Sequence, residues 1–436
     1  MKKFLRSALA VLLPVLVVSG FVLLPTGASD SGTATIPEYE VSVDPKPLEV
    51  VCPGSIVEVG GEDGTALDLV ERVGEAIVSG YSSEDISYPA LISDSLPLAV
   101  EGSVQSTELL SAIQAQAVSR QRVNGLAAAF CEQPVTVGWF ISGASGVGNE
   151  SVLIAANWND VDTQINVELH TPGGIVSERY SLAAGQERLI SLAPVAALAS
   201  LYAIRVESTG PAVSLALQNR WSRGLTPLGI ELTGTTQMPA TLHWIQPVTI
   251  LAEGYQNPTL RLFAPGLAAE TVVTAFGQEG PELLRTVVPE AGLVELELEL
   301  NPGSYLLKVE SDHEVLAGVR NPALDPLDYA WIYPQQLFTS LTLPVAGYST
   351  TLRLANPGAL AISLTLATET NDRRSFQTLA LGPFETTGIP LNADTVSVQS
   401  ANEFLAAMEI VDGGGYAVIS PSENKNLGED LSVRVR

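Results

Sequence analysis

Hydrophobic and polar residues alternate along much of the chain, most clearly between Trp139 and Gln218. Within this stretch Ile165, Val167 and Leu169 alternate with polar neighbours. A period of two places every second side chain on one buried face of a β-strand. The same kind of pattern predicts further short strands at 151–157, 175–181, 187–192, 202–208 and 213–218. We therefore predict a β-sandwich over this stretch.

The pattern of this sandwich recurs twice further along the chain. Segments beginning at Ser151, Thr259 and Thr351 align, and their starts are 108 and 92 residues apart. A second matching strand begins 53, 48 and 45 residues after these starts. The period is too long for common solenoids, whose repeats run at about 20 to 50 residues. We therefore predict separate domains joined like beads rather than one closed solenoid.

The predicted fold class is all-β, with tandem immunoglobulin-like or fibronectin-like sandwiches behind one N-terminal hydrophobic helix. Segments 219–246 and 321–349, rich in Pro, Gly and Thr, are expected to connect the beads, with the next strands starting at 245–251 and near Trp331. The expected divisions are an anchor or signal helix at 1–28, an extended spacer at 29–47, an acidic and mostly β segment at 48–136, sandwiches at 137–222, 223–322 (with its linker) and 323–424, and a tail at 425–436.

The N-terminus has the pattern of an export signal. Lys2, Lys3 and Arg6 precede the apolar stretch 8–24, which would span roughly 26 Å as a helix, against roughly 30 Å for the hydrocarbon core of a bilayer. Either it remains as a membrane anchor, or it is cleaved near Ala28 and the protein is secreted. In both cases the charge distribution predicts that the bulk of the chain lies outside the cell.

The composition fits an exported β protein: 46% hydrophobic, 16% charged, with 37 Gly and 28 Pro. The formal net charge is −26, and residues 30–133 hold 17 acidic and 4 basic side chains, or −13. This charge repels nucleic acid and anionic lipid headgroups, so neither is an expected ligand.

Cys52 and Cys131 are the two cysteines of the chain. In an exported protein they most economically form one disulfide, whereas a free-thiol pair or part of a metal site is less favoured without a neighbouring His. Between them, residues 113–117 alternate as in a strand, and apolar residues at 66–77 fit one face of a helix. We expect reduction of this disulfide to loosen residues 48–218 and to leave the third copy of the sandwich unaffected.

Three motifs resemble an actinobacterial family of exported, membrane-anchored proteins of unknown function. They are Val51-Cys52-Pro53-Gly54, Gly125-Leu126-Ala127-Ala128 followed by Cys131, and Trp139-Phe140-Ile141-Ser142-Gly143-Ala144. The resemblance covers about residues 48–330, and departs from the family pattern at Val137, Gly138 and Ser142. It implies an N-terminal anchor, a Cys–Cys pair and β-sandwiches, with no catalytic residues.

No constellation in the sequence indicates catalysis, a metal or a cofactor. His170, His243 and His313 lie in three different parts of the chain, and no nucleophile motif accompanies them. The glycines between Gly143 and Gly148 predict a turn, because no helix follows to bind phosphate. The oxygen-rich turn at 157–162 lacks the calcium-loop pattern. We therefore predict no enzyme.

Trp158 stands between Asn157 and Asn159, in a turn where the other copies have Pro265 and Pro357. An indole at a sandwich edge between two amides could stack on a sugar ring, although packing against a neighbouring domain is the favoured interpretation. These three residues are the candidate ligand contacts.

Three functional hypotheses follow. The first is a non-enzymatic, membrane-tethered protein of the cell envelope that binds another exported protein or organises the surface. The second is a module that binds cell-wall glycan through Trp158. The third is an accessory subunit of an envelope glycosyltransferase or transporter. Membrane contact would be made through residues 8–24.

Overall fold

The computed structural model describes residues 38–41, 49–61, 66–81, 90–91, 98–101, 111–196, 199–252, 256–324, 327–371, 373–422 and 431–434. These residues form β-strands and turns, with no helix among them, which confirms the predicted all-β class. Within this part of the chain there is accordingly no helix long and apolar enough to cross a membrane. The expected anchor at 8–24, the spacer apart from residues 38–41, and the C-terminal tail up to 430 lie outside the described residues.

The chain divides into two units, of which 46–426 is the larger. In the smaller unit, 1–45 with 427–436, strand β1 (Glu38–Val41) pairs antiparallel with β32 (Leu431–Arg434). The rest of the fold concerns the larger unit.

The first sandwich consists of two four-stranded antiparallel sheets. Ile165, Val167 and Leu169 on β12 are fully buried between them, as their alternation predicts. One sheet has the order β10 (Val137–Gly143), β15 (Tyr202–Ser208), β12 (Thr163–Thr171), β13 (Gly174–Leu182), and the other β14 (Gln186–Ser191), β11 (Asn149–Asn157), β16 (Ser214–Arg223), β17 (Thr226–Thr233).

The second and third copies repeat this topology. In each, one long strand, β23 (Gly303–Leu324) or β30 (Thr395–Asp412), runs through both sheets. The second copy also contains β18 (Ala240–Ile250), β19 (Thr259–Phe263), β20 (Ala269–Gly277), β21 (Gly280–Val288), β22 (Leu293–Glu297) and β24 (Leu327–Ile332). The third contains β25 (Phe338–Pro344), β26 (Ser349–Ala355), β27 (Ile362–Thr370), β28 (Arg373–Leu381), β29 (Thr386–Leu391) and β31 (Gly415–Ile419).

The expected linkers are themselves strands. Residues 219–246 contain the whole of β17, which hydrogen-bonds to β16 and extends the first sandwich past Ser222. Residues 321–349 contain β24 and β25, which pair with β23 and β30. Pro, Gly and Thr are tolerated there because these are edge strands, where fewer backbone N–H groups must bond to a neighbour.

The N-terminal segment contains a further four-stranded sheet, whose strand order resembles that of the β14-β11-β16-β17 sheet. Its strands are β6 (Ala90–Leu91), β5 (Ile77–Tyr81), β8 (Ser111–Ser119) and β9 (Asn124–Phe130). Two smaller pairs accompany it, β2 (Glu49–Cys52) with β7 (Leu98–Glu101), and β3 (Val57–Gly60) with β4 (Ala66–Arg72). The helix expected at 66–77 is therefore wrong: pairing of β4 with β3 and of β5 with β8 overrides the local helical period.

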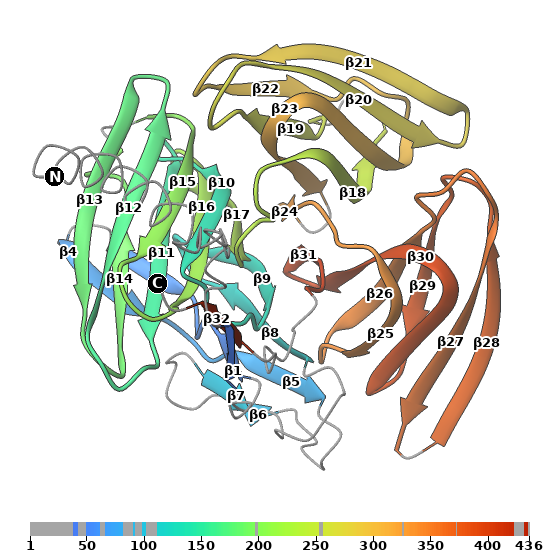
Figure 1. The fold of residues 1–436 in the computed structure, drawn as a ribbon, viewed down its shortest axis with the longest axis horizontal. Coiled ribbons are helices and arrows are strands. Elements are labelled where there is room, and N and C mark those ends of the chain that lie inside the picture. The colour runs from blue at the N-terminus through green and yellow to red at the C-terminus, as the bar shows by residue number, and fades with distance from the viewer. Residues whose placement is uncertain are drawn as a thin grey trace, which may run out of the picture. The chain divides into compact units, whose positions relative to one another are not determined.

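The N-terminal sheet that ends in β9 meets one sheet of each sandwich, and the contact is made by the last strand of each sheet. Strand β9 lies against β17 and β31, and β24 also lies against β17 and β31, so the four strands form a closed ring (Figure 1). We call β9, β17, β24 and β31 the four-strand junction. Each of them is a sheet edge, and mutual packing shields edges that would otherwise be exposed.

The cores extend across these boundaries. Ile113 and Leu126 share a core with Phe404 of the third sandwich, and Ala127 and Ala129 share another with Ile230 of the first. Trp139 of the first sandwich packs with Trp331 of the second. The bead arrangement is therefore wrong: the copies within 46–426 share hydrophobic cores instead of standing apart.

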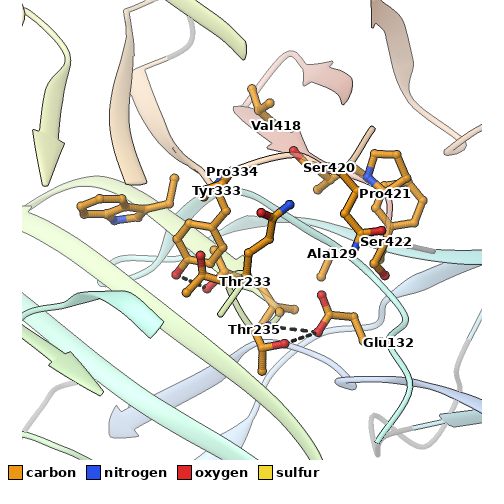
Figure 2. Close-up of a pocket in the computed structure, with 18 of the residues that line it drawn as sticks. Ala129, Glu132, Thr233, Thr235, Tyr333, Pro334, Val418, Ser420, Pro421 and Ser422 are labelled. Carbon is orange, nitrogen blue, oxygen red and sulfur yellow. Dashed lines mark hydrogen bonds between the residues drawn. The ribbon is translucent and has the colours of Figure 1, made fainter. Parts of the chain in front are cut away.

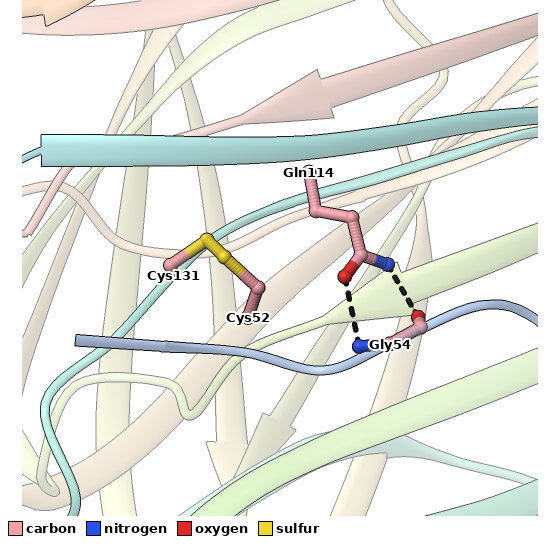
Figure 3. The surroundings of a disulfide bond; sticks show 4 residues. All are labelled: Cys52, Gly54, Gln114 and Cys131. Atoms are coloured by element: carbon pink, nitrogen blue, oxygen red, sulfur yellow. Dashed lines mark hydrogen bonds between the residues drawn. A yellow bond between two sulfur atoms is a disulfide. The ribbon is translucent and has the colours of Figure 1, made fainter. Parts of the chain in front are cut away.

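The predicted disulfide is confirmed. Cys52 and Cys131 are bonded, with 4.2 Å between their Cα atoms. Beside it the buried amide of Gln114 accepts a hydrogen bond from the Gly54 N–H and donates one to the Gly54 carbonyl (Figure 3). The end of β2 is thereby held to β8 and to the residue after β9.

Candidate functional site: the junction pocket

A buried carboxylate lies at the beginning of the four-strand junction. Asp328 Oδ2 accepts hydrogen bonds from the N–H groups of Leu126 and Tyr416, each at 2.9 Å. Oδ1 accepts from Ile230 at 3.2 Å and from Tyr329 at 2.9 Å. One N–H from each of the four strands thus converges on a single side chain, which holds the strands in register.

Glycine makes this convergence sterically feasible. A Cβ at Gly125 would lie 2.7 Å from Asp328 Oδ2, and a Cβ at Gly229 would lie 2.2 Å from Oδ1. Both glycines also have positive φ, +142° and +145°. Side-chain-bearing residues rarely adopt this backbone and would collide with the carboxylate. Gly125, Gly229, Asp328 and Gly415 hold equivalent positions in the four strands.

The other ends of the same strands line a pocket of about 240 Å³ (Figure 2). We call it the junction pocket. Apolar walls come from all four strands or the residues just after them, including Ala128, Ala129, Leu232, Trp331, Pro334, Val418 and Pro421. Polar groups come from the residues that follow, including Glu132, Thr235, Thr236, Gln237, Ser420 and Ser422.

Glu132 is the acidic residue of this lining. Its Oε2 accepts hydrogen bonds from the backbone N–H and the hydroxyl of Thr235, at 3.0 and 3.1 Å. Burial raises the pKa of Glu132 to about 7, although the two bonds from Thr235 oppose the rise. The carboxyl packs against Gly234, where a Cβ would lie 2.1 Å from Oε1. Glu132 is therefore held in one place and can take or release a proton near neutral pH.

Thr236 adds an unused hydrogen-bonding group. The residue is 6% exposed and its hydroxyl has no hydrogen-bond partner, while its backbone N–H donates to the Trp139 carbonyl at 2.8 Å. A buried hydroxyl without a partner costs free energy, so a ligand that bonds to it would remove that cost.

Tyr333 forms part of the wall and is fixed there. Its hydroxyl lies 2.7 Å from the Ser142 hydroxyl and 3.2 Å from that of Thr233. Burial raises the pKa of Tyr333 to about 12, so it stays neutral at physiological pH. Deeper in the junction Glu231 accepts bonds from the N–H groups of Leu232 and Trp331, and burial, reinforced by nearby Asp328, raises its pKa well above the usual range.

The histidines lie away from this pocket. The ring of His170 packs against Trp139 and Phe263, and His243 Nε2 is 2.7 Å from the Val315 carbonyl. His313 lies beside Asp312. The junction pocket therefore offers a carboxyl group and hydroxyls for binding, with no histidine to act as a base.

Of the three predicted ligand contacts in the first sandwich, Trp158 is exposed, whereas the side chains of Asn157 and Asn159 bond within the fold. Trp158 is 42% exposed, which agrees with its expected place outside the core. Asn157 is 1% exposed, and its amide donates to the carbonyls of Val161, Leu182 and Ala183. Asn159 donates to Asn157 Oδ1 and to the Ala212 carbonyl.

The same turn occurs in the third copy, where Asn356 donates to the carbonyls of Leu360, Leu381 and Gly382. The asparagine at this position closes the turn between two strands. The side-chain amide of Asn157 therefore bonds within the fold, and Trp158 is the exposed member of the three candidate ligand contacts.

Of the residues in the junction pocket, Ala128 belongs to one of the three sequence motifs and Trp331 lies near a predicted strand, but the sequence predicted no binding site there. A signal was present, since Tyr329-Ala330-Trp331-Ile332-Tyr333-Pro334 aligns with Tyr416-Ala417-Val418-Ile419-Ser420-Pro421. A Gly or Asp precedes each of the four junction segments. A fourth repeat could have been found from this alignment.

The model of one protein family, described as a family of unknown function, matches residues 93–392. No curated protein matches the chain. Among solved structures, the chicken CNTN1 FN1-FN3 domains align at 11% identity over 67% of this chain and 99% of that one, with a TM-score of 0.10, which is too low to support an argument.

Proposed function

Because the chain belongs to DUF5719, a family of unknown function whose model covers residues 93–392, we propose a function from the junction pocket: the protein is a non-catalytic, exported binding protein of the cell envelope. Its pocket holds a small part of another exported protein. The observation that carries this proposal is that all four sheets contribute to one pocket, which is lined by Glu132 and by Thr236, a residue whose buried hydroxyl has no partner.

Export is supported by the disulfide and by the N-terminal pattern. Disulfides persist in oxidising compartments outside the cytosol, and Cys52–Cys131 is formed. Lys2, Lys3 and Arg6 before the apolar residues 8–24 are typical of an export signal or membrane anchor. The motif resemblance to exported, membrane-anchored actinobacterial proteins points the same way.

Binding without catalysis is supported by the chemistry of the pocket. Glu132 is the titratable group at neutral pH in the lining, and the Tyr333 hydroxyl is bonded to Ser142 and Thr233. A rigid carboxyl beside hydroxyls and apolar walls recognises a ligand group by complementarity.

Site-specific crosslinking tests the proposal. Benzoylphenylalanine is placed at Gln237, a partly exposed residue of the lining, and the full chain is irradiated in its native cells. We expect a crosslink to one exported protein. The matched control carries the photoreactive group at Leu360, which is 81% exposed in a turn of the third sandwich.

Equal crosslinking from the two positions, or none from Gln237, contradicts a binding role for the pocket. A hydrolase screen on the purified protein gives an independent check. Turnover that disappears in Glu132→Gln would contradict the non-catalytic assignment.

A second candidate function, glycan binding through Trp158, has one observation in its favour, the 42% exposure of the side chain. The flanking asparagines bond within the turn, so the indole would have to act by stacking alone. Unchanged tryptophan emission on adding cell-wall glycan fractions would contradict it.

A further inference from the structure

We propose that the junction pocket is a receptor for one primary ammonium group on an alkyl chain, the side chain of a lysine on the partner protein. The inference rests on the proposed binding function and adds the chemical class of the group that enters the pocket.

The charge of the pocket is the first support. Its lining includes Glu132 and no Lys, Arg or His. Among the described residues no basic side chain forms an ion pair with Glu132, although eleven such pairs occur elsewhere in that part of the chain. A carboxylate removed from water is stabilised by a cation. The net charge of −26 attracts cations to the molecule and repels anions.

The unused acceptors are the second support. Both bonds that the Glu132 carboxyl accepts from described residues go to Oε2, which leaves Oε1 available. Thr236 offers a buried hydroxyl oxygen without a partner. An ammonium has three donors and no acceptor. It can therefore donate to Oε1, with the Thr236 hydroxyl as a further acceptor in the same lining, whereas an anion would meet a carboxylate.

The shape and the walls are the third support. At about 240 Å³ the pocket lies below the roughly 300 to 1,000 Å³ usual for small-molecule sites, so it suits a single side chain. Ala128, Ala129, Leu232 and Val418 line it with apolar surface. Four methylene groups can pack there while the terminal charge reaches the carboxylate, as lysine side chains do on protein surfaces.

The proton equilibrium of Glu132 adds a consequence. The pKa of this carboxyl, about 7, means that a bound ammonium must displace the proton from about half of the molecules at pH 7. Affinity should therefore fall as the pH drops from 8 to 6, by about tenfold.

The test is a calorimetric titration of the purified full chain with Nα-acetyl-lysine methylamide. The neutral comparison is the same compound acetylated on its side-chain nitrogen, and N-acetylglucosamine represents an uncharged sugar. We expect the lysine amide to bind at least tenfold more tightly than either. Glu132→Gln and Thr236→Val should each weaken its binding, and Glu290→Gln, which changes an exposed carboxylate outside the pocket, should not.

The outcomes separate this inference from the proposed function. Equal affinity for the lysine amide and its acetylated form, or unchanged affinity in Glu132→Gln with an unaltered circular dichroism spectrum, contradicts ammonium recognition. Binding of the sugar in preference to the lysine amide contradicts it too, yet leaves the pocket a binding site. If no probe binds and the crosslinker at Gln237 is silent, the binding function fails as well.

Discussion

Asp328 joins all four strands of the junction through one side chain. It stands where the other three strands have Gly125, Gly229 and Gly415, and its two oxygens accept one N–H from each strand. Each of these N–H groups belongs to the residue that directly follows Gly125, Gly229, Asp328 or Gly415. The carboxylate provides the acceptors that a β-ladder would otherwise supply.

Asp328→Asn should destabilise the protein by roughly 2 to 4 kcal/mol, because an amide nitrogen replaces one oxygen and leaves two buried N–H groups facing a donor. Urea unfolding followed by circular dichroism measures the loss. Asp160→Asn, at an exposed position in a turn of the first sandwich, is the control and should change little. A loss below about 0.5 kcal/mol in Asp328→Asn would contradict this account.

The buried carboxyl groups also predict how stability depends on pH. Burial raises the pKa of Asp328 and of Glu132 to about 7, and raises the pKa of Glu231 well above its usual range. The N–H groups that bond to Asp328 limit the rise in the pKa of Asp328. In the unfolded chain these groups titrate near pH 4. The folded state therefore binds more protons between pH 4 and 7, and its stability must fall as the pH rises through that interval.

We accordingly expect a higher urea midpoint at pH 5 than at pH 8. The difference should shrink in Glu132→Gln, which removes one of the three titrating groups. A midpoint that rises between pH 5 and pH 8 would show that ionised carboxylates dominate the folded state instead.

Strands in the N-terminal segment are joined by side chains as well as by backbone ladders. Gln116 on β8 accepts from the Ile56 N–H and donates to the Val73 carbonyl, at 2.8 and 2.7 Å. Gln218 on β16 accepts from the Val57 N–H and donates to its carbonyl, both at 2.6 Å. A primary amide has the same donor and acceptor as a peptide group, so each glutamine side chain makes the pair of hydrogen bonds that a neighbouring strand would otherwise make.

Gln218→Leu should therefore destabilise the protein by about 2 to 3 kcal/mol, since it leaves a buried N–H and a buried carbonyl of Val57 without partners. The rate of amide hydrogen exchange should rise most at residues 55–59 in Gln218→Leu. Gln377→Leu, on the exposed β28, is the matched control. Loss of protection spread evenly over 46–426 would argue against a local role for Gln218.

At the scale of residues 46–426, shared cores replace independent domains. Phe130 at the end of β9 belongs to the same core as Phe338 and Phe404 of the third sandwich. This contact changes the expected effect of breaking the disulfide. The sequence predicted that the third copy would be unaffected by reduction, and the shared core removes the physical basis of that prediction.

We now expect reduction of Cys52–Cys131 to increase hydrogen exchange in β8, β9 and the third sandwich together. The bond closes a separation of 79 residues, and its loss should cost roughly 4 kcal/mol on the chain-entropy model. Amide hydrogen exchange of the protein is measured with and without reductant and compared with that of the Cys52→Ala and Cys131→Ala double variant. Unchanged protection in β26 and β30 would mean that the third sandwich is energetically separate after all.

The sequence by itself determined the all-β class, the three sandwiches and the disulfide. Each rests on local information: Ile165, Val167 and Leu169 alternate because one face of β12 is buried, and Cys52 can pair with Cys131 alone. It failed where long-range contacts override local patterns. Residues 66–77 have a helical period but pair as strands, and Gln114 and Gln116 look like a solvent-facing side although both are buried.

Tertiary structure decided how the copies are joined and where a ligand can enter. Gly125, Gly229, Asp328 and Gly415 are up to 290 residues apart in the chain, and their shared place before the junction segments does not show that they meet. They acquire a role when four sheet edges pack against one another and the N–H groups beside them face one carboxylate. Glu132 likewise becomes a candidate binding residue through Gly234 and Thr235, which follow β17 and are about 100 residues away in the chain. Such convergence depends on packing between distant segments, which the spacing of residues along a chain does not encode.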